Sequence, residues 1–405
     1  MINAADTVWM LIATALVMLM TPTLGFFYGG LVRKKNILSV LMQCMVILSV
    51  ISIQWVLFGY TLAFGPDKGG IIGGLEWAFL NGVGLTPLDG QTIPHQLFVC
   101  FQMMFAVITP ALIVGAFAER IKFTGFLLFT ILWSTFVYDP MAHWVWASGG
   151  WLFSMGALDF AGGTVIHITA GISALVFSIL IGKRGGNGQS RSPHNLPFAV
   201  LGAAFLWFGW FGFNAGSALG VKGQTVSAFL NTNTAAAAAT ITWMMLDWLT
   251  HKIPTALGVI TGLVAGLVAI TPAAGYVTPM ASIAIGAGGS ILGFIFVSYV
   301  KKKFGYDDSL DVFGVHGIAG IWGALATGLF ASKEIGGTDG LFYGNPHQLW
   351  VQFITVMVAI AVSAIGTFVL YKICDFVIGM RVEARDENIG LDLTQHHESA
   401  YTLMD

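Results

Sequence analysis

The sequence predicts an all-α membrane protein, and three observations carry this prediction. Of its 405 residues, 56% belong to the apolar set AVILMFWYC and only 9% are charged, whereas soluble proteins carry about 25% charged residues. Apolar runs long enough to cross a bilayer as helices recur along the chain. The lysines and arginines gather in alternate connections between these runs. This composition excludes a disordered chain, a nucleic-acid-binding protein with a basic surface and an ordinary cytosolic enzyme.

We expect eleven transmembrane helices, because a span needs about 20 mostly apolar residues. The first run is not expected to be a cleaved signal peptide, because its basic cluster Arg33–Lys35 follows the run and does not precede it. The approximate runs are 7–31, 36–63, 95–118, 123–145, 161–182, 195–219, 224–249, 254–273, 277–300, 311–331 and 346–379.

The basic residues predict the orientation of these spans. With the N-terminus outside, 15 of the 18 lysines and arginines lie on the cytoplasmic side, Arg191 among them. The outer connections hold only Lys68, Lys222 and Lys333. Since cytoplasmic loops are enriched in basic residues, we expect an outside N-terminus and a cytoplasmic C-terminus. A miscounted helix would have disturbed this alternation.

Two segments resemble each other and predict an inverted repeat. Residues 159–171 read DFAGGTVIHITAG and residues 308–320 read DSLDVFGVHGIAG. In both, a histidine follows an aspartate by eight residues, and Ala-Gly follows the histidine by three and four. The copies lie in runs five and ten, so two five-helix halves would cross the membrane in opposite senses. Such repeats place a site near the bilayer midplane.

His167 and His316 are the first candidates for such a site. At about 1.5 Å per residue, each lies roughly a dozen Å along its helix from the aspartate, and the two start from opposite faces. Ionisable residues inside spans are rare and read as functional by default. Two unrelated core histidines and a metal site are the alternatives, and the metal site lacks a third ligand in register. For Asp159 and Asp308, helix capping is the favoured interpretation.

Several aromatic residues lie in polar or glycine-rich context. Phe101 and Phe105 are one helical turn apart in run three, Trp146 ends run four, and run six carries Trp210, Phe213 and Ser217. These side chains would suit a cage for a small cation, although their spacing alone favours core packing. Gly258, Gly262 and Gly266 form a small-residue packing face. The three cysteines lie in apolar runs and are expected to be buried and inert.

The chain is expected to divide into two parts. Residues 1–379 would form the transmembrane domain, with halves at about 7–182 and 195–331 and an extra helix at about 346–379. Residues 380–405 are acidic and would form a cytoplasmic regulatory tail. Because Ile389, Leu391 and Leu393 lie among the charges, the tail is expected to dock and not to remain structureless.

At this point the sequence resembles the Amt/Mep/Rh ammonium transporter family over essentially its whole length. The resemblance rests on ITPALIVGAFAER, DFAGGTVIHITAG, WFGWFGFNAGSA, DVFGVHGIAG and GLDLTQHHESAY, in family order. Trp146 resembles the Amt branch. The adjacent histidines His396 and His397 depart from the family's tail.

The resemblance implies a role for each candidate residue. Phe105, Trp146 and Ser217 would form the outer ammonium site, and Phe105 and Phe213 the stacked gate below it. His167 and His316 would line the pore with Trp210, and Asp159 would lie under the vestibule. It further implies a homotrimer in the plasma membrane, ammonium and ammonia (and methylammonium) as substrates, a PII-type partner on the cytoplasmic face, no cofactor and no enzymatic activity.

Two other function classes were weighed against transport of ammonium. A secondary carrier for another small solute would use the same repeat, but no matching Pro/Gly breaks appear in the two halves. A membrane-embedded enzyme would need a nucleophile or metal set in register with the histidines. A sensor role is a variant of the ammonium transport hypothesis.

Overall fold

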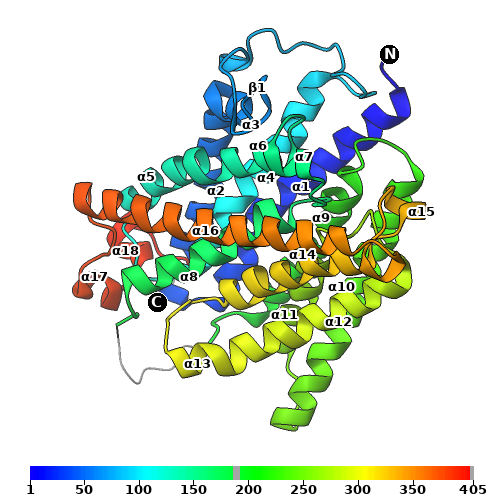
Figure 1. The fold of residues 1–405 in the computed structure, drawn as a ribbon. Helices are drawn as coiled ribbons and strands as arrows, with labels where there is room; N and C mark the ends of the chain where they lie inside the picture. The colour runs from blue at the N-terminus through cyan, green and yellow to red at the C-terminus, as the bar shows by residue number, and fades with distance from the viewer. Residues whose placement is uncertain (186–191, 402–405) are drawn as a thin grey trace.

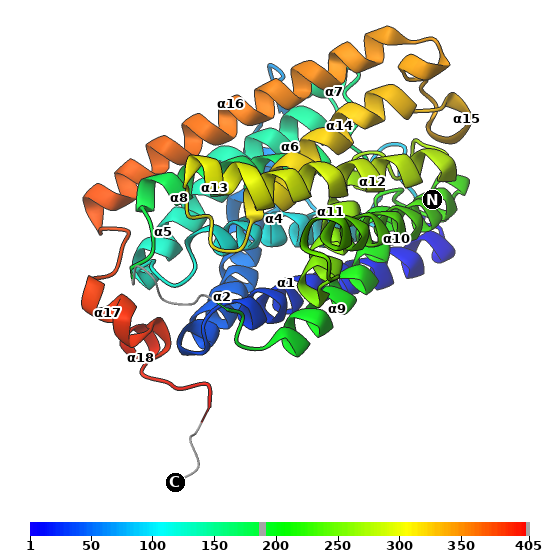
Figure 2. The same ribbon diagram turned by 90° about the horizontal axis from the view of Figure 1, so that it is seen from below.

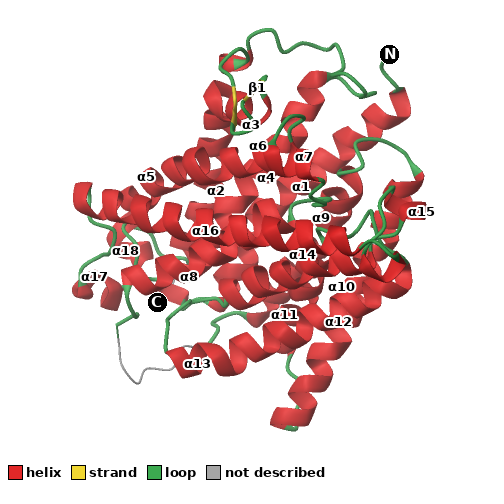
Figure 3. Cartoon of the chain, in the orientation of Figure 1, coloured by secondary structure: helices red, strands yellow, loops and turns green. Residues whose placement is uncertain are grey.

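The computed structural model describes residues 1–185 and 192–401 and is almost entirely helical (Figures 1 and 3). Arg191 and the last four residues of the tail, both used in the sequence argument, lie outside the described residues. The α-helices are α1 Ala4–Leu31, α2 Ile37–Gln54, α3 Tyr60–Phe64, α4 His95–Phe117, α5 Phe123–Trp133, α6 Asp139–Trp146, α7 Trp151–Met155, α8 Thr169–Ile181, α9 Leu196–Gly216, α10 Gly223–His251, α11 Ala256–Ile270, α12 Pro279–Ile295, α13 Lys301–Phe304, α14 Ala319–Phe330, α15 Lys333–Gly336, α16 Pro346–Val377, α17 Ala384–Ile389 and α18 Leu391–His396.

Shorter elements connect or extend these helices. The two strands β1 Asp67–Lys68 and β2 Ile72–Gly73 pair antiparallel. Five π-helical turns continue α-helices without a break, and three 3-10 turns lie in connections. The π turns are η2 Trp55–Gly59, η4 Ser134–Tyr138, η5 Gly163–Ile168, η6 Phe296–Val300 and η7 Phe313–Ile318, and the 3-10 turns are η1 Lys34–Asn36, η3 Ala78–Leu80 and η8 Leu341–Tyr343.

Nine helical segments in the described chain are long and apolar enough to cross a membrane. They coincide with nine of the eleven predicted runs, and eight of them lie within a few residues of the predicted limits. The exception is Phe123–Met155, which ends ten residues after the predicted limit of run four. The other two runs correspond to α10, which is long but less apolar, and to α11, which has only 15 residues. The structure therefore supports a polytopic membrane protein, with helices at all eleven predicted places.

Glycines allow the long helices to approach closely. On α9, a Cβ atom at Gly202 would lie 2.5 Å from the backbone nitrogen of Phe27 on α1. On α11, Cβ atoms at Gly262 and Gly266 would lie 2.4 Å from side-chain atoms of α10. The small-residue face predicted in this helix is confirmed. Such contacts replace the hydrophobic driving force that is absent between helices in lipid. Figure 2 shows α1 and α9 side by side, with α10 and α11 next to them.

The two ends of the bundle differ. At one end, called here the hairpin end, the β1–β2 hairpin contacts the start of α7, since Trp151 N–H donates to the Gly70 carbonyl over 3.2 Å. At the same end the loop before α4 contacts the N-terminal residues, since Asn3 N–H donates to the Thr92 carbonyl over 2.8 Å. At the other end, called the tail end, α17 and α18 lie under the connections between helices (left in Figure 1). The two candidate regions described below lie between these ends.

A buried ionic network joins the connections at the tail end. Arg184 contacts Asp307 at 2.8 Å and Glu119 at 3.2 Å, and Arg33 contacts Glu119 at 3.0 Å. Burial by itself raises the pKa of the Glu119 carboxyl, but the hydrogen bond from Arg33 and the charge of Arg184 hold it below its ordinary value. The pKa of Asp307 is lowered in the same way by Arg184. The network therefore keeps its charges and links four connections that are distant in sequence.

The tail docks on this end through polar contacts. The Arg381 guanidinium donates to the Ile181 carbonyl over 2.9 Å. The Asp392 carboxylate accepts the Ser39 N–H at 2.8 Å, at the start of α2. Of the three apolar residues expected to dock, Leu391 is buried, but Ile389 and Leu393 are 42% and 55% exposed. The expectation that Ile389 and Leu393 would dock was wrong. Because Asp392 caps the start of α2, only one face of the short tail helices is turned inward.

One cysteine also departs from the sequence expectation. Cys44 and Cys374 are buried, as expected, whereas Cys100 is exposed. Cys100 lies on α4, most of whose residues face the core, but its own position points away from the neighbouring helices. An apolar run in a membrane protein indicates a span and not burial within the protein, because lipid accepts apolar side chains as readily as the core does.

Candidate functional site

A pocket at the hairpin end gathers aromatic side chains from α3, α4, α6 and the loop before η5. It has a volume of about 160 Å³ and is called here the aromatic pocket. Three of the four predicted ammonium-site residues line it, namely Phe105, Trp146 and Ser217. The sequence analysis did not single out its other lining residues, which are Phe64, Gln91, Phe98, Gln102, Phe160 and Leu219. Gln102 was detectable as a polar residue between Phe101 and Phe105.

Polar contacts fix the orientation of the pocket residues. The Trp146 indole N–H donates to the Asp159 carbonyl over 2.8 Å, which holds the ring in the wall of the pocket. The Ser217 hydroxyl donates to the Phe213 carbonyl over 2.9 Å. Because its only proton is used in this bond, the Ser217 oxygen keeps its lone pairs as acceptors for a ligand N–H.

The fourth predicted residue, Asp159, does not line the aromatic pocket. Its carboxylate accepts three backbone N–H groups, from Gly162 at 3.1 Å, Thr164 at 2.9 Å and Val165 at 3.0 Å. Gly162 has φ of 107°, a left-handed conformation that suits glycine. Asp159 therefore caps the π turn η5, which carries His167, while its backbone carbonyl holds Trp146.

Phe105 lines the aromatic pocket and packs against Phe213. Their ring centroids are 4.4 Å apart and their planes are tilted by 33°. Phe105 also meets the edge of Trp146 at 5.9 Å, and Phe101 packs against its other side at 4.8 Å. Both phenylalanines are fully buried, at 1% exposure each. The two rings therefore form a buried apolar contact next to the pocket.

Below this pair lie the two histidines of the repeat. The Nδ1 atoms of His167 and His316 are 3.2 Å apart, although 149 residues separate them in sequence. His167 stacks on Trp210 at 5.5 Å, and its ring lies 6.1 Å from that of Phe213. Trp210 is held by a hydrogen bond from its indole to Thr271. Within the described residues, no third histidine, cysteine or acidic residue joins them as a metal ligand would.

The histidines come together because two equivalent turns carry them. His167 is in η5 and His316 in η7, each a six-residue π turn. Asp308 accepts the Phe313 N–H at 2.7 Å, as Asp159 accepts N–H groups of η5. Both aspartates are therefore caps, the interpretation favoured from spacing. The two turns thus place the two Nδ1 atoms in contact. One of these nitrogens donates a proton and the other accepts it.

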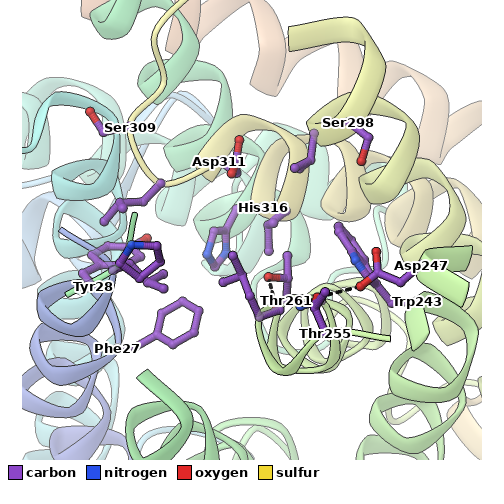
Figure 4. Close-up of a pocket in the computed structure, with 17 residues that line it drawn as sticks. Phe27, Tyr28, Trp243, Asp247, Thr255, Thr261, Ser298, Ser309, Asp311 and His316 are labelled. Carbon is purple, nitrogen blue, oxygen red and sulfur yellow. Dashed lines mark hydrogen bonds between the residues drawn. The ribbon is translucent and has the colours of Figure 1, made fainter. Parts of the chain in front are cut away.

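A second cavity reaches His316 from the tail end and has a volume of about 270 Å³. Figure 4 shows His316 near its centre, with Tyr28 and Phe27 on one side and Trp243, Asp247 and Thr255 on the other. Asp311 also lines it. The sequence analysis did not single out Asp247, although an acidic residue in the last turn of an apolar run was a usable signal. This cavity is called here the acidic cavity.

A buried row of phenylalanine and imidazole rings lies between the two cavities, inside a bundle of membrane-length helices. This arrangement is typical of a polytopic membrane protein that transports a small solute. The chain belongs to the Ammonium Transporter Family, whose sequence model matches residues 8–401. The membrane and transporter predictions are thereby confirmed, and so is the family inferred from the sequence motifs.

Individual relatives agree with this assignment. The ammonium transporter of Bacillus subtilis (strain 168) is 54% identical over 399 residues, 98% of each chain. The ammonium transporter of Aquifex aeolicus (strain VF5) is 48% identical over 404 residues, covering 99% of this chain and 94% of that protein. Among solved structures, Saccharomyces cerevisiae Mep2 has a TM-score of 0.90 at 34% identity, covering 95% of this chain and 89% of its own.

Proposed function

We propose that this chain moves ammonium across the membrane by binding the cation in the aromatic pocket, removing a proton and conducting ammonia past the paired histidines. One observation carries the proposal. Trp146, Phe105, Phe213, His167 and His316 form a continuous row, with successive ring centroids 5.9, 4.4, 6.1 and 5.3 Å apart. The row begins in the aromatic pocket and ends in the acidic cavity.

The aromatic pocket has the groups that a small cation requires. The ring faces of Trp146 and Phe105 attract positive charge through their quadrupoles. Ser217 offers oxygen lone pairs to an N–H donor, and the Asp159 carboxylate adds negative potential beneath the pocket. The proposed substrate-binding residues are therefore Phe105, Trp146, Ser217 and Asp159, with Asp159 acting through Trp146 and through the field of its charge.

The path below the pocket excludes ions. Moving a bare monovalent ion into a medium of ε near 4 costs on the order of 20 kcal/mol, and the proposed gate consists of the two apolar rings of Phe105 and Phe213. Ammonium alone among common monovalent cations can leave a proton behind. The neutral ammonia then meets His167 and His316, which offer hydrogen-bonding nitrogens and can relay a proton. The proposed path makes and breaks no carbon–nitrogen bond, so the proposed activity is transport and not catalysis.

The architecture proposed is eleven spans in two inverted halves plus the last helix α16. The paired turns η5 and η7, which carry His167 and His316, support this symmetry. The excess of basic residues at the tail end supports an outside N-terminus and a cytoplasmic C-terminus. The transmembrane domain would comprise residues 1–379 and the tail residues 380–405.

We further propose a homotrimer in the plasma membrane, with the cytoplasmic face as a docking surface for a PII-type signalling protein. Support comes from family membership and from the docked tail. Several apolar side chains on the outer faces of α9 and α10 remain exposed in the single chain, which suits contact with lipid or a neighbouring copy; they include Phe208, Val226, Leu230 and Ile241.

Uptake of labelled methylammonium into proteoliposomes tests the transport proposal. We expect saturable uptake above that of empty liposomes, and an imposed pH gradient will show whether a proton crosses with the solute. Absence of uptake in both conditions, from protein that elutes as one species on size exclusion, would overturn the proposal.

Replacing Trp146 by leucine should weaken binding without stopping transport. The substitution removes a cation–π face worth about 0.5–2 kcal/mol, which corresponds to about 2- to 30-fold in apparent affinity. Phe105→Ala should act similarly and also change closure of the gate. The measurement is the concentration dependence of methylammonium uptake, with Trp350→Leu on the exposed face of α16 as the matched control. Unchanged half-saturation in both pocket variants would argue against a cation site here.

Truncation after Arg381 should leave assembled protein that no longer binds a PII-type partner. It removes the Asp392 contact to the start of α2 and the Glu387 contact to Arg381, so we also expect altered transport. The test is a pull-down of the PII-type protein from the same organism with full-length and truncated protein under nitrogen-rich conditions. Binding to neither form would remove the partner from the proposal and leave transport untouched.

A further inference from the structure

His143 is a buried histidine whose two ring nitrogens both face hydrogen-bond acceptors. The side chain is 0% exposed. Its Nδ1 lies 2.9 Å from the Ala63 carbonyl oxygen, and its Nε2 lies 2.9 Å from Oδ1 of Asp67. A carbonyl and an ionised carboxylate can only accept, whereas a neutral imidazole has a single N–H. Two such contacts require a proton on each nitrogen, so the geometry makes His143 an imidazolium.

The surroundings of the ring favour this positive charge. Ala63 lies in the last turn of α3, which ends the continuous helix Lys34–Phe64. Carbonyls in a last helical turn lack intrahelical donors, and the negative end of the helix dipole attracts a cation. The hydrogen bond from His143 holds the pKa of the Asp67 carboxyl below its ordinary value. Asp67 is therefore ionised at neutral pH, and the proton between the two groups belongs to His143.

The other ionisable groups around α6 do not compete for this ring. The elements packed against α6 include α3, β2, α7, η4 and η5. Within the described residues, the imidazole is hydrogen-bonded to the Ala63 carbonyl and the Asp67 carboxylate, and its one ion pair is with Asp67. The remaining titratable side chains on these elements, in the hairpin region and on α6 itself are Tyr60, Lys68, Glu76, Tyr138, Asp139 and His167.

His143 joins two walls of the aromatic pocket. Phe64 directly follows the residue whose carbonyl the imidazole binds, and Trp146 lies three residues after His143 on α6. Both aromatic side chains line the pocket. The His143 carbonyl accepts the Ala147 N–H at 3.1 Å, which closes the last turn of α6 at Trp146. A movement of the imidazole away from its partners would therefore change the spacing between Phe64 and Trp146.

We infer that His143, paired with Asp67, is a positioning residue of the aromatic pocket, which keeps Phe64 and Trp146 in place for cation binding only while the pair holds its proton. The inference rests on the proposed transport function and adds a residue that lines neither cavity. When the proton leaves, the Nε2–H bond breaks, hydroxide takes the proton to become water, and the Nε2 lone pair faces the carboxylate. The Asp67 side chain is 29% exposed, so the pair exchanges protons with the medium at the hairpin end.

The half-saturating concentration of transport should therefore rise with pH, because the contact exists at low pH and is lost as the proton leaves. Labelled methylammonium uptake is measured in proteoliposomes at equal pH on both sides, from about pH 5 to about pH 9, which contains the ordinary titration range of imidazole. We expect a rise of about three- to tenfold, within the about 2- to 30-fold that the whole Trp146 face is worth. Maximal uptake should stay constant, since the conduction path is unchanged.

Asp67→Asn separates the proton from the contact. An asparagine with its amide nitrogen toward Nε2 donates to a neutral imidazole, so the contact no longer needs the second proton. It gives up the Gly70 N–H, which Oδ1 of Asp67 accepts at 2.8 Å. We therefore expect a half-saturating concentration that is raised equally at every pH and has lost its pH dependence. Glu76→Gln is the matched control, because it removes another carboxylate of the same loop, one that pairs with Lys68. It should keep the pH profile of the parent.

A pH profile of Asp67→Asn parallel to that of the parent would overturn the inference, as would a parent whose half-saturating concentration does not depend on pH. If Asp67→Asn does not assemble, Trp146→Leu supplies the test: the pair acts through this ring, so the pH dependence should shrink in that variant. An undiminished pH dependence there would contradict the positioning role. Absence of uptake by the parent at every pH would instead overturn the proposed function.

Discussion

Asp159→Ala is expected to abolish ammonium transport. The change leaves the N–H groups of Gly162, Thr164 and Val165 without their acceptor in a buried turn. An unsatisfied buried donor costs about 1–3 kcal/mol, and the affected turn positions both His167 and, through the Asp159 backbone, Trp146. The aromatic pocket and the histidine pair should therefore be lost together. Uptake of labelled methylammonium at saturating concentration measures the effect.

Asp159→Asn separates the capping role from the charge. The carboxylate Oδ2 serves Thr164 and Val165, and Oδ1 serves Gly162. An asparagine oxygen can keep the first two bonds, so this variant should assemble and insert. Because the negative charge beneath the pocket is gone, we expect uptake to fall at least about tenfold, ~1.4 kcal/mol. An Asn variant that transports like the parent would show that the charge has no role. One that fails to assemble would show that the residue is mainly structural.

His167→Ala and His316→Ala should each change the conduction path while the protein still assembles. Each substitution removes one of the two ring nitrogens in contact at 3.2 Å and leaves space beside Trp210 or the acidic cavity. Water entering that space lowers the barrier to ions. We expect ammonium flux, or its selectivity against potassium, to change by about tenfold or more, ~1.4 kcal/mol.

The measurement is uptake of methylammonium and of labelled rubidium, a potassium substitute, into the same proteoliposomes. His347→Ala is the control, since His347 is exposed in the first turn of α16. Parent-like flux and selectivity in both pore variants would contradict the role assigned to the pair. An effect confined to one histidine would place the selective step on its side of the pair.

The positions of the membrane helices could be predicted from the sequence, because the signals are local. A run of apolar residues must be helical in lipid, where no water satisfies the backbone. The predicted limits of α4, 95–118, differ by one residue at one end from His95–Phe117. The aspartate caps were equally local, since Asp159 lies only three to six residues before the N–H groups that it accepts.

The paired histidines were predictable for a different reason. Their equal spacing from Asp159 and Asp308 revealed two copies of one turn, and inverted copies converge at one depth. The spacing indicated a similar depth only. The contact of two Nδ1 atoms at 3.2 Å depends on the packing of η5 against η7, where Gly171 and Gly317 leave space for the close approach.

Tertiary structure alone decided which polar residues share a cavity. Asp247 and Asp311 are 64 residues apart in sequence, and nothing local indicates that both line one cavity with His316 or that only Asp311 meets a lysine. The exposure of Cys100, which was expected to be buried, was likewise decided by packing. An apolar residue is stable against lipid as well as against protein, and charge balance depends on neighbours that only the fold brings close. The sequence thus determined the spans, the caps and the repeat, and packing between distant helices decided the geometry of the path.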